Sequence, residues 1–165
     1  MNESTLSVLV EDKAGVLARV SSLLARRGFN IHSRAVGPTS EPHLSRMTIV
    51  VEAPELEEVK KQLNKLVNVV KITELDQVQT VEQEVMLIRV AAGGGKRTEI
   101  LELAQIFDAI PVDVSPSSIM FSITGPPRKV NDFLDLVRPH GIVELVKSGR
   151  VALARDAKNR RAKAV

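Results

Sequence analysis

The hydrophobic residues of this chain follow two alternating spacings. Apolar residues at every second position predict strands, and apolar residues three and four positions apart predict one face of a helix. In the first half of the chain these patterns predict the order strand, helix, strand, strand, helix, strand, at residues 6–11, 16–27, 30–36, 47–51, 56–66 and 69–75. This order is a βαββαβ unit, and Gly28 stands where a glycine ends the first helix.

The second half of the chain repeats the same order. Its patterns predict the corresponding elements at residues 84–92, 98–107, 110–114, 119–124, 126–137 and 142–146. Proline follows the third strand in both halves, at Pro54 and Pro126, where the first turn of a helix tolerates it. We therefore predict an α+β fold of two tandem ferredoxin-like βαββαβ units, residues 1–77 and 78–155, joined near a polar stretch at residues 77–83.

Units of this kind leave surfaces uncovered. A unit of about 70 residues with two helices covers only one face of its sheet. The other face and the edge strands stay open, and residues 30–36 are predicted to form an edge strand in which Arg34 is the only charged side chain. We therefore expect the chain to associate with another copy or another protein through a face or an edge.

Composition narrows the class of protein. Hydrophobic residues make up 44% and charged residues 26% of the 165 residues, as in globular proteins. Cysteine is absent, which excludes disulfides, thiolate metal ligands and cysteine nucleophiles and fits a reducing cytoplasm. No apolar run approaches the roughly 18 residues of a membrane span, and residues 1–5 lack the features of a signal peptide. We therefore expect a cytoplasmic protein without a membrane anchor.

The basic residues are concentrated towards the C-terminal end. The formal net charge is +3, but residues 150–165 contain six bases and one acid, so residues 1–149 carry a net charge of −2. An RNA-recognition fold with this strand order stacks bases on aromatic side chains of its central strands, and residues 45–52 contain none. We therefore predict no nucleic-acid binding by the folded part, and a disordered basic tail over residues 156–165.

No group of residues forms a catalytic or metal-binding motif. Gly95 and Lys96 resemble a phosphate-binding loop, but Val90 stands where that loop needs its first glycine and Arg97 where it needs serine or threonine. The three histidines lack metal-ligand spacing, and no Gly-x-Ser-x-Gly elbow presents a serine nucleophile. We predict a non-catalytic chain that itself binds no metal or cofactor.

The turn between the first predicted strand and helix, residues 11–17, allows two interpretations. Gly15 at the start of a helix lets backbone N–H groups and the helix dipole approach an anion, and Asp12 beside it can accept an ammonium group. Together these groups suit an α-amino acid. Alternatively, Asp12 or the residues after it cap the helix and turn the chain. The residues alone leave both interpretations open.

Several segments resemble the small, regulatory subunit of acetolactate synthase (acetohydroxyacid synthase), whose N-terminal domain is an ACT domain. The most extensive is LSVLVEDKAGVLARV at residues 6–20. Others lie at residues 26–31, 44–51, 62–71, 112–116 and 148–155. The resemblance extends to about residue 155 and implies that the first unit is an effector-binding ACT domain through which the chain forms a homodimer.

The resemblance implies a regulatory role in the biosynthesis of valine, leucine and isoleucine. In this family the small subunit activates a catalytic large subunit, which uses thiamine diphosphate, Mg and FAD. It also confers feedback inhibition by a branched-chain amino acid, and valine is the effector we expect here. A competing hypothesis is a free-standing tandem ACT-type amino-acid sensor that regulates gene expression. The sequence contains no helix-turn-helix or other DNA-reading element, which counts against that hypothesis.

The resemblance also implies an effector site between the ACT domains of two chains. The turn of one chain and the second strand of the other contribute Asp12, Gly15, Val16, Leu17, Asn30 and Ile31. In such a site Gly15 and the helix N-terminus bind the effector carboxylate, and Asp12 faces its ammonium group. The apolar members of the set line the branched side chain.

Overall fold

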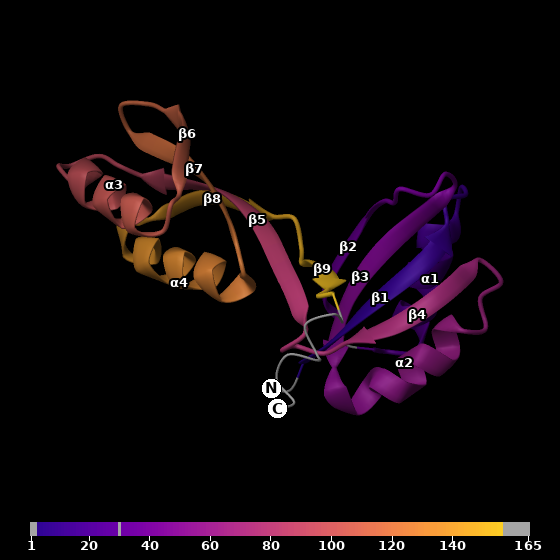
Figure 1. Cartoon of the computed structure of the whole chain (residues 1–165). Coiled ribbons are helices and arrows are strands. Elements are labelled where there is room, and N and C mark those ends of the chain that lie inside the picture. Colours follow the sequence, from indigo (N-terminus) through magenta and orange to yellow (C-terminus); the bar gives the residue numbers. More distant parts are fainter. Residues whose placement is uncertain (1–2, 30, 157–165) are drawn as a thin grey trace, which may run out of the picture. The chain divides into compact units, whose positions relative to one another are not determined.

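The computed structural model describes residues 3–29 and 31–156. The chain divides into two compact units (Figure 1). The first combines the residues up to Val81 with those from Arg150 onward, and the second spans Glu82–Gly149. Each unit has its own hydrophobic core.

The first unit is a four-stranded antiparallel sheet with two helices on one face (Figure 1). Its elements are β1 (Glu3–Glu11), α1 (Val16–Arg26), β2 (Ile31–Pro38), β3 (Leu44–Glu52), the short 3₁₀ turn η1 (Ala53–Glu55), α2 (Leu56–Leu63) and β4 (Val69–Leu75). The strand order is β2-β3-β1-β4, so β2 and β4 are the edges. Leu6, Val8 and Val10 of β1 are buried against the helices, as their alternation predicts.

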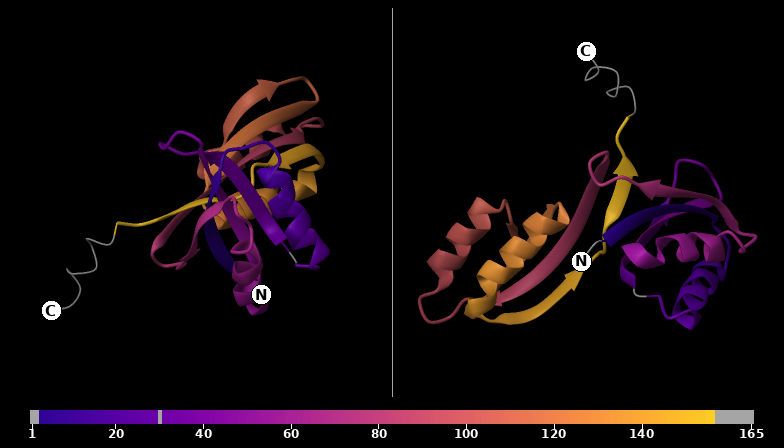
Figure 2. Two further views of the ribbon diagram at one scale, coloured as in Figure 1. Left: turned by 90° about the vertical axis from the view of Figure 1, so that its right-hand side faces the viewer. Right: turned by 90° about the horizontal axis from the view of Figure 1, so that it is seen from below.

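The second unit has the same arrangement. Its elements are β5 (Thr80–Ala91), α3 (Arg97–Ile106), β6 (Ile110–Val114), β7 (Ser118–Gly125), α4 (Pro127–Val137), the 3₁₀ turn η2 (Arg138–His140) and β8 (Ile142–Lys147). The strand order is β6-β7-β5-β8, and α3 and α4 lie on one face of that sheet (Figure 2). Phe121 and Phe133 are fully buried and meet edge to face, with ring centroids 6.0 Å apart. Such a pair adds about 1 kcal/mol beyond the area that it buries.

The predicted fold class is confirmed: the chain is an α+β protein of two tandem βαββαβ units. Two local expectations differ from the structure. Residues 80–83, expected in the polar join, belong to β5, and Val151–Ala154 form a further strand, β9, that the periodicity did not predict. All four residues of β9 are apolar, so no alternation marks it as a strand.

The chain division places β9 in the first compact unit, although its strand partner is β5. β9 contacts β3 and β4 of that unit, and the backbone N–H of Ala152 donates to the hydroxyl of Thr48, 104 residues earlier. From the sequence we predicted residues 150–155 in the second domain, because local periodicity does not indicate contacts with residues so far away in the chain. The predicted basic tail beyond residue 156 lies outside the described residues.

Candidate functional site

A pocket opens where β1 leads into α1. Its volume is about 420 Å³, and it is lined by the end of β1, the following turn, the first turn of α1, the end of β2 and the start of β3. Val10, Val16 and Met47 form a buried apolar floor. Leu17 and Val36 at the rim are 46% and 47% exposed. The pocket therefore joins an apolar interior to a rim that the chain leaves partly open to solvent.

The turn beside this pocket leaves the N-terminus of α1 without a side-chain cap. Gly15 is the N-cap residue, in the left-handed conformation with φ of 84°, and within the described part of the chain no side chain caps this end of the helix with a hydrogen bond. The first turn of α1 contains no acidic residue. Backbone bonds shape the turn instead, including one of 2.7 Å from the N–H of Asp12 to the carbonyl of His43. Asp12 therefore does not cap the helix, and no carboxylate of the helix's own first turn offsets the positive end of its dipole.

The two carboxylates at the pocket differ in their partners. Glu11 accepts a hydrogen bond of 2.6 Å from the amide of Asn68 and pairs with Lys13 at 3.1 Å. The amide of Asn68, and then Lys13, hold the pKa of Glu11 below its ordinary value. Among the described residues, none forms a hydrogen bond or ion pair with the side chain of Asp12, which is exposed. The Asp12 carboxylate is thus available to a cationic group, whereas that of Glu11 is engaged.

The structure brings together only part of the predicted set. Asp12, Val16 and Leu17 line the pocket, and Gly15 forms the adjoining helix N-cap. Ile31 lies at the opposite end of the sheet: it pairs with Val51, whose partner on β1 is Ser4 rather than a residue near Glu11. Ser4 and Glu11 are about 24 Å apart along the strand. Asn30 lies outside the described residues. One chain therefore does not place Ile31 at its own pocket.

Several pocket residues were not predicted from the sequence. They are Val36, Gly37 and Pro38 at the end of β2, and Ser45 and Met47 on β3. The pairing Pro38↔Ser45 next to Glu11↔Leu44 brings the end of β2 to the end of β1. The end of β2 lies near the end of β1 because of the antiparallel register of the sheet. Pairing the predicted second and third strands as a hairpin could therefore have indicated these residues.

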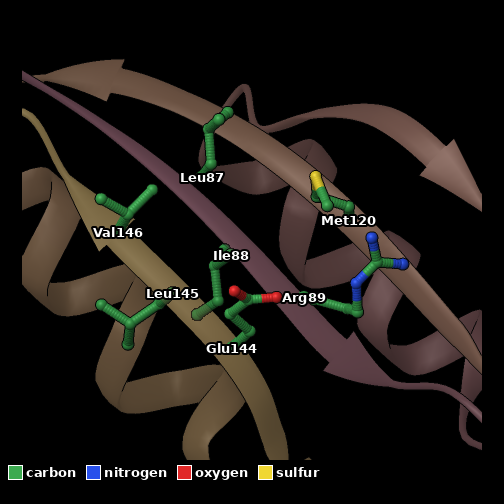
Figure 3. A pocket seen from close by; sticks show the side chains of 7 residues that line it. All are labelled: Leu87, Ile88, Arg89, Met120, Glu144, Leu145 and Val146. Carbon is green, nitrogen blue, oxygen red and sulfur yellow. The ribbon is translucent and has the colours of Figure 1, made fainter.

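A smaller hollow of about 140 Å³ lies on the second sheet, on the face opposite its helices (Figure 3). Leu87, Met120 and Val146 line it together with the charged Arg89 and Glu144. Arg89 donates to Asp113 on β6 at 2.9 Å. This hollow has no helix terminus in its lining and is a depression in an exposed apolar face.

The described part of the chain contains no group of three or more histidine, cysteine, aspartate or glutamate residues that could hold a metal ion. None of its helices is long and apolar enough to cross a membrane.

Comparison with known proteins assigns both units. Residues 6–71 match the family described as the AHAS small subunit-like ACT domain, and residues 83–156 match the small subunit of acetolactate synthase. The acetolactate synthase small subunit of Mycolicibacterium smegmatis is 51% identical over 153 residues, 92% of this chain and 90% of that protein. This chain belongs to the acetolactate synthase small-subunit family.

Other members agree in sequence and in structure. A probable acetolactate synthase small subunit of Archaeoglobus fulgidus is 52% identical over 156 residues, 93% of this chain and 98% of that protein. The crystal structure of the small subunit from Thermotoga maritima superposes with a TM-score of 0.87 at 39% identity, covering 94% of this chain and 99% of that one. The predicted family is confirmed. As an acetolactate synthase small subunit, the chain is a regulatory subunit of a transferase holoenzyme.

Proposed function

We propose that this chain activates the catalytic large subunit of acetolactate synthase and makes it sensitive to feedback inhibition by a branched-chain amino acid, with valine as the expected effector. The observation that carries the proposal is the pocket before α1, where an apolar floor meets an uncapped helix N-terminus and the carboxylate of Asp12. The reaction and its cofactors, thiamine diphosphate, Mg and FAD, belong to the large subunit in this proposal, and the compartment is the cytoplasm.

Each feature of the pocket matches one group of an aliphatic amino acid. The backbone N–H groups after Gly15 and the positive end of α1 suit the effector carboxylate. The exposed carboxylate of Asp12 suits its ammonium group. The side chains of Leu17 and Val36, both partly exposed at the rim, suit the branched hydrocarbon.

The position of β2 supports a site shared by two copies. β2 is an edge strand, so its outer side can pair with another strand. If two copies pair antiparallel through β2, Ile31 of one copy lies beside Pro38 of the other, at the pocket that Pro38 lines. Such a dimer has two equivalent sites, and each combines the turn of one copy with the β2 start of the other.

A ligand held between two chains provides a route to regulation. Binding at a shared site stabilises one arrangement of the dimer relative to others, and a bound large subunit responds to the arrangement that is populated. Linkage then requires that binding of the large subunit change the effector affinity by the same factor.

Two measurements test the proposal. Calorimetry of the purified chain with valine, leucine and isoleucine should show one effector site per chain. Acetolactate formation by the cognate large subunit should rise when this chain is added and fall when the bound amino acid is added. An absence of binding by all three amino acids, together with unchanged activity in the reconstituted enzyme, would overturn the proposal.

A further inference from the structure

The outer face of the first sheet, opposite its helices, is covered by the chain's own C-terminal segment. This face mixes polar and apolar residues, and Thr5, Thr48 and Val50 on it are each less than 5% exposed. Strand β9 accounts for part of this burial: Ala152 is 4% exposed, and its N–H donates to the hydroxyl of Thr48 at 3.3 Å. Figure 1 shows β9, in yellow, beside β3.

Arg150, immediately before β9, links two strands of that sheet. Its backbone N–H donates to the hydroxyl of Ser33 on β2 at 2.9 Å, and its guanidinium group donates to the carboxylate of Glu3 on β1 at 2.6 Å. The side chains of Arg150 and Glu3 are only 20% and 27% exposed, so water screens this ion pair less than a surface pair. Because β3 lies between β2 and β1, Arg150 joins two strands that do not hydrogen-bond to each other.

The bond to Ser33 is made where β2 is irregular. Ile31 pairs with Val51 and Ser33 with Val50, so the register shifts between them. An irregularity of this kind redirects side chains and weakens the local ladder. As an edge strand, β2 has only β3 as a neighbour in the sheet. The start of β2 therefore has few backbone contacts of its own, and the Arg150 bond lies two residues from Ile31.

We propose that Arg150 is a positioning residue for the effector site: with β9, it holds the start of β2 in the position that lets Ile31 complete the pocket of a second copy. The inference rests on the proposed function. According to this proposal, residues 150–154 follow the second domain in sequence but contribute to effector binding by the first domain. A chain that ends before Arg150 then retains Asp12 and Gly15 but binds the effector weakly.

The test uses the full-length chain with its large subunit. Ser33→Ala removes the acceptor of the Arg150 N–H, and Arg150→Met removes the guanidinium group while keeping a long apolar stem. We expect each variant to raise the calorimetric dissociation constant for valine, leucine or isoleucine, whichever the wild type binds, and the concentration for half-inhibition, by about five- to tenfold. Ser33→Thr retains a hydroxyl and should restore wild-type affinity.

A matched control lies at the other end of β9. Arg155→Met makes the same substitution at an exposed residue whose backbone N–H, rather than its side chain, bonds to Gln79. It should leave the effector dissociation constant unchanged. The double variant of Glu3→Gln with Arg150→Met should lose no more affinity than Arg150→Met alone, because both changes remove one interaction.

The outcomes separate the inference from the proposed function. If the wild type binds none of the three amino acids and leaves the activity of the large subunit unchanged, the proposed function fails. If the wild type binds but Ser33→Ala and Arg150→Met bind equally well, or if Arg155→Met weakens binding as much as Arg150→Met, only the inference is overturned. Binding is measured below the thermal transition of each variant, since a merely structural role lowers the melting temperature and leaves the dissociation constant of the folded chain unchanged.

Discussion

The two βαββαβ units share one topology but differ at the start of their first helices. Among the described residues, neither α1 nor α3 has a side-chain cap, but α1 begins directly after Gly15 and has no acidic residue in its first turn. α3 follows three consecutive glycines at positions 93–95, has Lys96 as its N-cap and carries Glu99 in its first turn. A carboxylate in that position interacts favourably with the helix dipole. Of these two helices, α3 has a first-turn carboxylate that offsets the helix dipole and α1 does not.

The outer faces of the two sheets differ as well. In the first unit, β9 lies against the outer face and its Ala152 N–H donates to Thr48. In the second, Leu87 and Val146 are 40% and 60% exposed around the hollow of Figure 3. The first unit closes its face with its own chain and keeps β2 as an edge. The two units thus share one topology and differ in short segments, namely the turn before the first helix and the strand β9.

The largest expected effect comes from placing a negative charge at the N-cap of α1. Gly15→Asp puts a carboxylate where the effector carboxylate is proposed to bind, and we expect about a 100-fold loss of effector affinity from like-charge repulsion at short range. Calorimetry measures this loss. Calorimetry of the wild-type chain also gives the binding stoichiometry. One effector per chain is expected if α1 provides a site and α3 provides no second one.

Gly15→Asn is the matched control. Asparagine has the shape of aspartate without its charge, and both residues enter the left-handed conformation more readily than other residues with a Cβ. Space is not limiting, since a Cβ at Gly15 meets no atom within 4 Å. Equal affinities of the two variants would mean that no carboxylate binds at this helix terminus.

Much of this architecture could be predicted from the sequence. Both βαββαβ repeats follow from periodicity because their cores use alternating residues such as Leu6, Val8 and Val10. The turn half of the pocket was predicted because Asp12 and Gly15 are neighbours in sequence. The β2 and β3 lining was not, because it depends on strand register. The strand β9 was missed because its four apolar residues show no alternation, and its bond to Thr48, 104 residues away, leaves no local pattern.

A smaller effect is expected from the two carboxylates at the pocket. Asp12→Asn removes the proposed partner of the effector ammonium group and should weaken binding about tenfold. Glu11→Gln should change affinity less than about twofold, because Asn68 and Lys13 already engage Glu11. Calorimetry of both variants compares the two losses of affinity. A larger loss for Glu11→Gln than for Asp12→Asn would mean that the ammonium group binds Glu11 and not Asp12.

The smallest effect concerns acid stability. The amide of Asn68 and the ammonium group of Lys13 lower the pKa of Glu11 in the folded chain. Glu11 therefore contributes stability above its unfolded pKa of about 4.3, and this contribution is lost as pH falls through the lower folded value. Asn68→Ala removes the main cause of the lowered pKa, so its stability deficit relative to wild type should be present at pH 7 and smaller at pH 3, as measured by urea unfolding.

The control lies in the second unit, where Asn131 accepts a hydrogen bond from Lys147. Asn131→Ala breaks a pair without a carboxyl group, so its deficit should not shrink on acidification. A deficit of Asn68→Ala that is equal at both pH values would show that the Asn68 bond does not depend on the charge of Glu11.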